Sequence, residues 1–231
     1  MITAEVNKVK YNIPTSWLDV SYKQWLNIQS EKDEITILSI LTTIPKELLE
    51  QMTRGQLSKL LLAISFIQTQ PTLGESKTDI DIRKYTYGQK ILLQQLIEKN
   101  KDNIMLIIGD VVSLYSTKKY NENYATKEVD GSFIEIYGLA LNIINQLKRI
   151  LEVEHENLSV KPTSEQLQAG VDMFDKFGVM NTVKALALGN ILNYEKILKI
   201  DYNTVYLHLW MAKTDHDFQE NYRRILEHKR K

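Results

Sequence analysis

The chain has 231 residues, with 29 Lys and Arg against 29 Asp and Glu, and 43% of its residues are hydrophobic. These values are typical of an ordinary globular protein, and the zero net charge gives no general attraction to a polyanion. There is no cysteine, which excludes disulfide scaffolds, thiolate zinc sites, iron–sulfur clusters and cysteine nucleophiles.

Evidence for β-structure is limited to two short segments. Apolar and polar residues alternate over Glu5 to Ile13 and again over Ile80 to Tyr85, each with β-branched residues and each followed by a turn or helix signal. This pattern predicts at most one small β-ribbon and excludes a large sheet.

Helix starts are marked by a repeated pair of residue types. Ser or Thr followed three residues later by Gln forms a capping box, in which the two side chains bond to each other's backbone amides. Apolar residues at helical spacing follow each pair. The four pairs are Ser21 with Gln24, Thr53 with Gln56, Thr86 with Gln89, and Thr163 with Gln166.

Other helices are predicted from Asp33, from Pro45 in the first turn of a helix over 46–52, and from Asp201. A long helix is expected from Phe133 to Leu158, because its apolar residues form one stripe. The sequence therefore predicts an all-α protein of about nine or ten helices, with one small β-ribbon at most.

Loops divide this series of helices into modules. The predicted loops are Thr69 to Thr78, Thr117 to Ser132 and Ser159 to Pro162. They give an amino-terminal module over 1–70, a middle module over 71–160 with the long loop 117–132, and a carboxy-terminal module over 161–231. No internal repeat or heptad seam is recognised in the sequence.

The amino terminus and the most apolar stretch of the sequence indicate where in the cell the protein is expected. Residues Met1 to Pro14 have no continuous apolar core of the length that a secretory signal requires. Ile104 to Leu114 has about half the length of a membrane span and is interrupted by Gly109 and Asp110. We therefore expect no membrane segment and a cytoplasmic chain.

Patterns that would indicate catalysis are missing. The four histidines are His155, His208, His216 and His228, and none stands in the H-E-x-x-H spacing that joins two imidazoles and a base on one helix face. The glycines are too far apart to form a phosphate-binding loop, and no G-x-S-x-G elbow occurs. We predict no catalytic, cofactor-binding or metal-binding residue, and no enzyme activity.

A cluster of aromatic residues near the carboxy terminus favours a protein contact. Tyr202, Tyr206 and Trp210 recur at every fourth residue and share one helix face, which Met211 extends. Such a helix is either the centre of its module or a subunit interface, where aromatic residues and Met are enriched. The long loop adds Tyr120 and Tyr124 as further interface candidates, because uncovered loops of this length are often functional.

The end of the chain is basic and gives the one candidate for a nucleic-acid contact. The basic residues there are Arg223, Arg224, His228, Lys229, Arg230 and Lys231. Cations at a helix carboxy terminus also suit the negative pole of the helix dipole. We therefore expect a solvated helix end and regard a transient nucleic-acid contact as the alternative.

Several segments resemble one group of tailed-bacteriophage tail-region proteins. Residues 12–21 read NIPTSWLDVS and residues 37–47 read ILSILTTIPKE, similar to an entry motif and a helix pair in that group. Residues 57–66 continue this opening, and residues 177–182, 186–190, 202 and 219–222 are similar to the end of the same group. The chain departs from the pattern at Thr43, where glycine is usual, and at Val179, where an aromatic residue often follows the glycine.

This resemblance implies a structural role in the phage particle. Members are ring or connector subunits of the neck and tail, as in crAss-like phages, or assembly chaperones that hold a tail or baseplate protein and then leave. The first role implies a homo-oligomeric ring bound to other tail or neck proteins, present in the host cytoplasm during assembly and later in the virion tail. The second implies absence from the mature virion.

Overall fold

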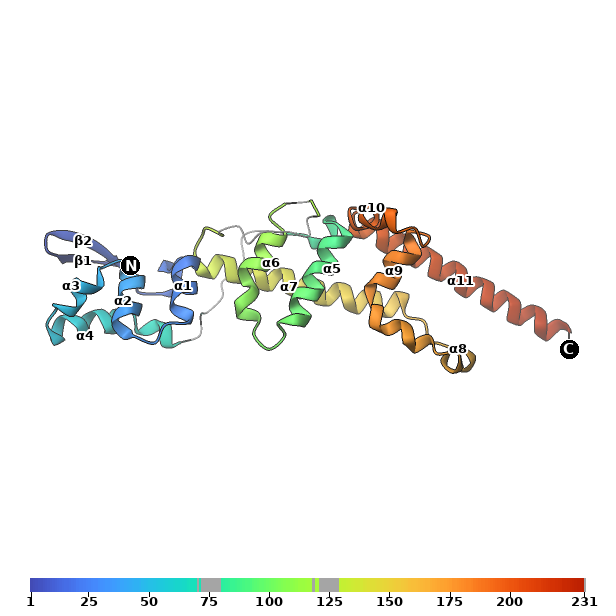
Figure 1. Ribbon diagram of the computed structural model, residues 1–231, viewed down its shortest axis with the longest axis horizontal. Helices are drawn as coiled ribbons and strands as arrows, with labels where there is room; N and C mark the ends of the chain where they lie inside the picture. Colours follow the sequence, from blue (N-terminus) through green and yellow to red (C-terminus); the bar gives the residue numbers. More distant parts are fainter. Residues whose placement is uncertain (70, 72–79, 118, 121–128, 231) are drawn as a thin grey trace. The chain divides into compact units, whose positions relative to one another are not determined.

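The computed structural model describes residues 1–69, 71, 80–117, 119, 120 and 129–230. Over these residues the chain forms eleven α-helices, six short 3-10 helices and one two-stranded antiparallel ribbon (Figure 1). The predicted all-α class with a small ribbon is therefore confirmed.

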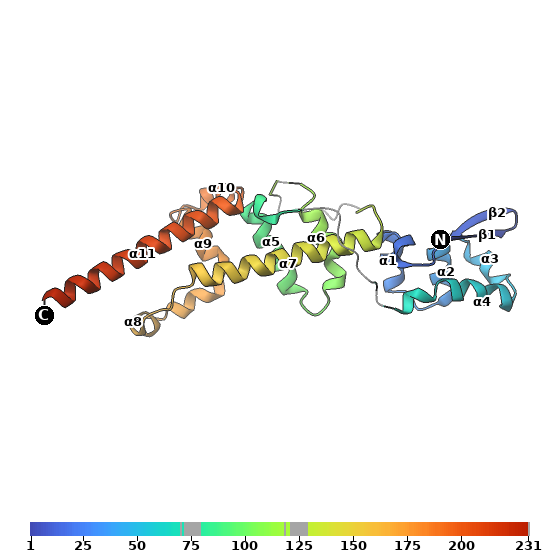
Figure 2. The same ribbon diagram turned by 180° about the vertical axis from the view of Figure 1, so that it is seen from behind.

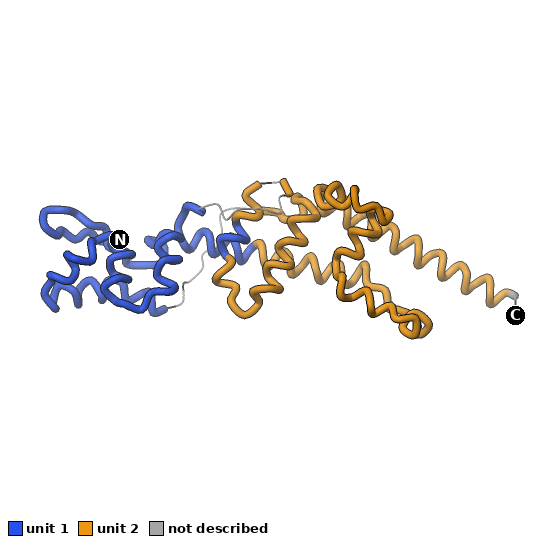
Figure 3. Tube along the Cα trace, viewed as in Figure 1, with its two compact units in different colours: residues 1–79, 108–112, 126–142 blue, residues 80–107, 113–125, 143–231 orange. Residues whose placement is uncertain are grey.

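The chain divides into two compact units (Figure 3). Unit 1 comprises Met1–Asp79, Ile108–Val112 and Thr126–Asn142, and unit 2 comprises Ile80–Ile107, Ser113–Ala125 and Ile143–Lys231. Each unit combines segments that are far apart in the sequence, whereas the three predicted modules are continuous stretches. The predicted boundary near residue 160 lies within unit 2.

Unit 1 begins with the ribbon and continues with short helices. Its elements are β1 Ile2–Val6, β2 Val9–Ile13, η1 Trp17–Asp19, α1 Tyr22–Gln29, α2 Glu34–Thr42, α3 Lys46–Glu50, α4 Arg54–Ala63 and η2 Ser65–Gln68. In the ribbon, Ile2 lies opposite Ile13 and Val6 opposite Val9. Asn7 and Lys8 form the turn with φ of 51° and 67°, as a two-residue hairpin with two left-handed positions requires.

A cluster of aromatic side chains lies in unit 1. Trp25 of α1 stacks on Phe133 with ring centroids 4.8 Å apart, and Trp17 contacts Phe133 at 5.2 Å. Beside them, the hydroxyl of Tyr22 accepts a hydrogen bond from the amide of Gly109 at 2.8 Å. A side chain at Gly109 would overlap the Tyr22 ring, so this close approach requires glycine. Burial raises the pKa of Tyr22.

Unit 2 contains the longest helices. Its elements are η3 Ile82–Lys84, α5 Tyr87–Lys99, η4 Ile104–Ile107, α8 Ser164–Gln168, η5 Val171–Phe177, α9 Val179–Leu186, η6 Ile191–Asn193, α10 Tyr194–Leu198 and α11 Tyr202–Arg230. Two helices have residues in both units, α6 Ile108–Leu114 and α7 Phe133–Leu158. The bounds of α7 are those predicted from its apolar stripe.

All four predicted capping boxes are confirmed. They begin α1, α4, α5 and α8, and in each the Ser or Thr side chain accepts from the Gln backbone amide while the Gln side chain accepts in return. Asp33 caps α2 as predicted. Pro45 is the N-cap residue of α3, one position before the predicted first turn.

The second predicted strand, Ile80 to Tyr85, is wrong. Residues 82–84 form the 3-10 helix η3, whose first turn is capped by the carboxylate of Asp81. The side chain of Gln146 on α7 accepts from the amide of Ile82 at 3.1 Å and donates to the carbonyl of Ile80. A side chain from a distant helix therefore takes the hydrogen bonds that a partner strand would have supplied.

Candidate interaction surfaces

The first turn of α11 is anchored in the core of unit 2. Tyr202 and Val205 are each 3% exposed. The amide of Tyr202 donates to the carbonyl of Tyr85, and the amide of Tyr87 donates to the carbonyl of Ile200, both at 2.8 Å. These two bonds join the start of α11 to the start of α5.

A buried ion pair strengthens this anchor. The ammonium of Lys90 on α5 lies 2.7 Å from the carboxylate of Glu154 on α7, with side chains only 5% and 19% exposed. Burial raises the pKa of Tyr202, and the nearby carboxylate of Glu154 raises it further. One turn further, Asn157 donates to the hydroxyl of Tyr206 at 2.8 Å. Helices α5 and α7 thus hold the start of α11.

Beyond Tyr206, α11 leaves the body of its unit. From Leu207 to Lys229 every residue is exposed except Leu209, Lys213 and Glu220, which are half-buried. Both ribbon views show the helix extending past the other helices of unit 2 (Figures 1 and 2). From Leu207 onward, α11 is therefore an open surface.

One face of this open helix is apolar. We call it the α11 stripe, and its residues recur at helical spacing: Leu207, Met211, Thr214, Phe218, Asn221, Tyr222 and Ile225. The five apolar members among them are 52% to 64% exposed. Apolar residues on this spacing on a soluble helix ordinarily face a core, so the stripe is a surface suited to a partner.

The predicted aromatic face divides between core and surface. The rings of Tyr202, Tyr206 and Trp210 stack in succession, with centroids 6.0 and 6.1 Å apart. Tyr202 is buried and Tyr206 half-buried, whereas Trp210 is 45% and Met211 64% exposed. Trp210 and Met211 therefore remain accessible to a partner, and Tyr202 belongs to the anchor.

The two candidates from the long loop have different outcomes. Tyr120 is half-buried, and its ring lies so close to Gly88 of α5 that any side chain at Gly88 would overlap it. The carbonyl of Leu198 approaches the same glycine. Tyr120 thus packs on the body of unit 2, while Tyr124 lies outside the described residues.

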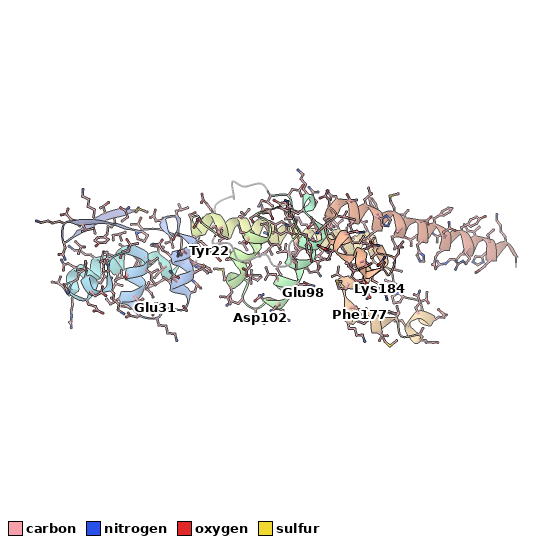
Figure 4. The ribbon with its side chains drawn as sticks, turned by 45° about the horizontal axis from the view of Figure 1, so that its top comes forward. Tyr22, Glu31, Glu98, Asp102, Phe177 and Lys184 are labelled. Atoms are coloured by element: carbon pink, nitrogen blue, oxygen red, sulfur yellow. The ribbon has the colours of Figure 1, made fainter. Side chains whose placement is uncertain are left out.

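A second apolar surface covers residues 164–193, which we call the short-helix surface. In this stretch, which includes α8, η5, α9 and η6, only Val183 and Ala187 are buried. Large apolar side chains lie exposed along it, including Phe177 on η5 (Figure 4). They are Leu167, Met173, Phe174, Phe177, Met180, Leu188, Ile191 and Leu192.

Leu188 is the most exposed of these side chains. It is 93% exposed, and its backbone adopts a φ of 52°, in the left-handed region that costs about 1–2 kcal/mol for a residue with a side chain. Strained positions of this kind concentrate at functional sites. A large apolar side chain held outward on such a backbone is difficult to explain by the stability of the isolated chain.

No protein-family model, no curated protein and no solved structure matches this chain.

Two further properties of the described residues concern metal binding and membrane insertion. Among them, no three His, Asp or Glu side chains converge in a way that would hold a metal ion, and no helix is long and apolar enough to span a membrane. Ser159 lies 3.1 Å from Nδ1 of His155, but both side chains are exposed and stand one helical turn apart, where neighbours meet through helix geometry. The contact between Ser159 and His155 therefore does not by itself identify a catalytic serine with its general base.

An open groove of about 540 Å³ lies on α7 in unit 2. Its lining is chiefly aliphatic, from Ile97, Ile144, Leu147 and Leu151, with Lys148, Glu152 and His155 at its border. The lining suits an apolar side chain of a partner better than a polar substrate.

The basic end of the chain continues α11. Its residue Arg224 pairs with Glu220 at 3.3 Å, one turn earlier on the same helix. Acidic residues are interspersed along this helix, at Asp215, Asp217, Glu220 and Glu227. The described part of the tail therefore presents mixed charge, and a nucleic-acid contact there stays a prediction.

The two surfaces were only partly predicted. Trp210 and Met211 were named from their spacing, but the short-helix surface was not, because exposure of an apolar residue depends on what packs against it. The α11 stripe does carry a sequence signal. Its steps from Leu207 to Ile225 alternate between four and three residues, and polar Thr214 and Asn221 at two positions obscure the pattern.

Proposed function

We propose that this chain is a non-enzymatic structural protein of a tailed bacteriophage, a ring or connector subunit of the neck–tail assembly that acts through helix-mediated contacts. The observation that carries the proposal is the short-helix surface, where a stretch of thirty residues, 164–193, buries only Val183 and Ala187. Ordering each residue costs about 1–2 kcal/mol of backbone entropy, which so little burial does not offset. A partner that covers this surface would supply the missing apolar burial.

The phage assignment rests on the sequence motifs. Residues 12–21 and 37–47 support it through their similarity to tail-region proteins. A ring subunit repeats one heterologous contact around a closed axis, so it needs two complementary surfaces on one chain. The short-helix surface and the groove on α7 are candidates for these roles, with other neck or tail proteins as further partners.

The location of the protein follows from this role. The chain would be in the host cytoplasm during assembly and in the tail of the finished virion. No membrane and no stable nucleic-acid partner belongs to this proposal, since contact through apolar helix surfaces requires neither.

The second candidate is an assembly chaperone that binds one tail or baseplate protein and is absent from the mature virion. The exposed α11 helix favours it, because a protein that holds a single client needs only one adhesive surface.

Mass spectrometry of purified mature particles separates the two candidates. A ring subunit is present in a fixed copy number above one, whereas a chaperone is expressed during infection and absent from particles. A chain that is neither in particles nor bound to any tail protein in infected cells would contradict both.

A further inference from the structure

We propose that the α11 stripe binds the α11 stripe of a second copy of this chain, with the two helices antiparallel. This contact goes beyond the proposed role in the particle, because it joins two copies through α11, whichever partner the short-helix surface binds. The inference starts from the openness of the helix. Isolated helices are marginal in water, and the i,i+4 ion pairs of Lys213 with Asp217 and Glu220 with Arg224 contribute only a few tenths of a kcal/mol each.

The spacing of the stripe suits another helix. From Leu207 the stripe advances by four, three, four, three and four residues to Ile225, which is the repeat that keeps one seam facing a partner helix. Met211, Phe218 and Ile225 occupy equivalent positions, one heptad apart. Leu207, Thr214 and Asn221 occupy the other set. From Thr214 to Ile225, small and large side chains therefore alternate along the seam.

This alternation favours antiparallel pairing. When a two-fold axis passes between Phe218 and Asn221, each Phe218 lies against the smaller Asn221 of the second copy. In the next layer, each Ile225 lies against the smaller Thr214, and beyond it Met211 lies against His228, so the contact uses the part of the stripe from Met211 onward. A parallel pair would instead set the two Phe218 rings against each other and the two Asn221 side chains against each other, which leaves the layers unequal in size.

The charges beside the seam favour the same orientation. Asp217 and Arg224 directly precede Phe218 and Ile225, so both flank the stripe on one side. In an antiparallel pair these flanks meet, and Asp217 of each copy faces Arg224 of the other. In a parallel pair Arg224 would instead face Lys229, a like charge.

The same two residues are already held in place within each helix. Asp217 is paired with Lys213, and Arg224 with Glu220. Each contact between copies would therefore extend an existing ion pair into a network of four charges, with opposite signs adjacent throughout.

Sedimentation of the full chain tests for the pair, and Phe218→Ser tests the stripe. We expect a dimer in the wild type, and at least about a hundredfold increase in its dissociation constant in F218S, because both copies lose a buried ring. Phe218 is 60% exposed in one copy, so F218S should leave the thermal transition unchanged when it is measured below the dissociation constant of the wild-type dimer. Leu62→Ser, an equally drastic change at a leucine that is 75% exposed on α4 and lies in neither apolar surface, should leave the dimer intact.

Charge exchange tests the orientation. Asp217→Arg and Arg224→Asp should each weaken self-association, since like charges then face each other. In a mixture of the two variants, every flanking contact between unlike copies becomes attractive. We expect more mixed dimers than random pairing gives.

Cross-linking tests the orientation a second time, on a chain with no cysteine of its own. Thr214→Cys and Ile225→Cys should form a disulfide with each other in a mixture. Neither should link to itself, because equivalent residues lie eleven residues, or about 16 Å, apart along an antiparallel pair, beyond the reach of a disulfide of about 7 Å.

Three results would overturn the inference. They are a monomer at concentrations up to about 100 μM, a dimer that F218S leaves intact, and efficient self-linking of either cysteine variant. None of them bears on whether the chain is found in mature particles, so the pairing and the proposed function fail separately.

Discussion

The ammonium of Lys90 lies 2.7 Å from the carboxylate of Glu154, and both side chains are largely withdrawn from water. This pair joins α5 to α7 close to Tyr202, at the start of α11. The start of α11 therefore lies beside a largely buried carboxylate, that of Glu154, whose charge is compensated by Lys90.

Removing one member of this pair should destabilise unit 2. We expect Lys90→Met to lower the free energy of unfolding by about 3–5 kcal/mol, because it leaves a partly buried carboxylate without a counter-ion. Chemical denaturation followed by circular dichroism measures the change. The double variant K90M/E154Q, which removes both charges, should recover most of the loss.

The exposed pair of Lys199 and Glu195 is a matched control. Its side chains are 56% and 73% exposed, so Lys199→Met should change the stability by less than about 1 kcal/mol. An equal loss at Lys90 and Lys199 would mean that the Lys90 pair is solvated like any surface pair.

The two ends of the predicted aromatic face should respond differently to truncation. Trp210→Ala should weaken assembly with partners and preserve the cooperative thermal transition, because Trp210 is 45% exposed. Tyr202→Ala should instead cost about 3–5 kcal/mol, as for a buried aromatic residue. Incorporation into particles and thermal denaturation measure the two effects. Loss of the transition in W210A would identify that ring as part of the core.

We expect a substitution at Leu188 to raise the stability of the chain and to weaken its binding to a partner. Asparagine adopts the left-handed backbone conformation more readily than leucine, so Leu188→Asn should raise the free energy of unfolding by up to about 1 kcal/mol. The same change removes the most exposed leucine of the short-helix surface and should reduce incorporation into particles. A variant that is more stable and fully incorporated would refute a contact role for this side chain.

Thr43 provides the control for backbone strain alone. It ends α2 with a φ of 59°, the position where a helix commonly requires glycine. Thr43→Gly should therefore stabilise unit 1 by a similar amount. Because Thr43 is not part of either apolar surface, we expect incorporation to be unchanged.

Asp33 should make unit 1 sensitive to acid. Its carboxylate accepts from Lys46 at 2.8 Å and from the amide of Thr36 at 3.2 Å, which lowers the pKa of Asp33 from 3.8 to about 2. Since the folded pKa lies below the unfolded one, this contribution to stability is complete above about pH 4 and is lost as the pH falls towards 2.

An NMR titration of the Asp33 carboxylate measures this directly. In Lys46→Met the midpoint should move up towards 3.8, because the largest cause of the shift is the hydrogen bond from Lys46. A wild-type midpoint already near 3.8 would show that the contact with Lys46 does not persist in solution.

Local signals predicted much of the fold. The four capping boxes need only residues three apart, and the α7 stripe needs only its own periodicity, so both are readable from sequence. The segment from Ile80 to Tyr85 is different, because its hydrogen bonds go to Gln146 on another element. A side chain more than sixty residues away leaves no mark on the local pattern.

The interaction surfaces were less predictable for a related reason. Tyr202 and Trp210 stand on the same helix face two turns apart, yet one is buried and the other open. The difference depends on where α5 and α7 lie beside α11, not on the residues of α11. Gly88 also depends on its neighbours. A side chain at this position is excluded only because Tyr120 and Leu198 approach it, which the local sequence does not indicate.

The placement of the tryptophans has an optical consequence. Trp25 is buried and Trp17 half-buried in the aromatic cluster of unit 1, whereas Trp210 lies on the open part of α11. In a variant with Trp17→Phe and Trp25→Phe, Trp210 is the remaining tryptophan. Its indole would emit as a water-exposed fluorophore until a binding partner covers that part of α11. A shift of its emission to shorter wavelength would then report occupancy in real time, without any added label.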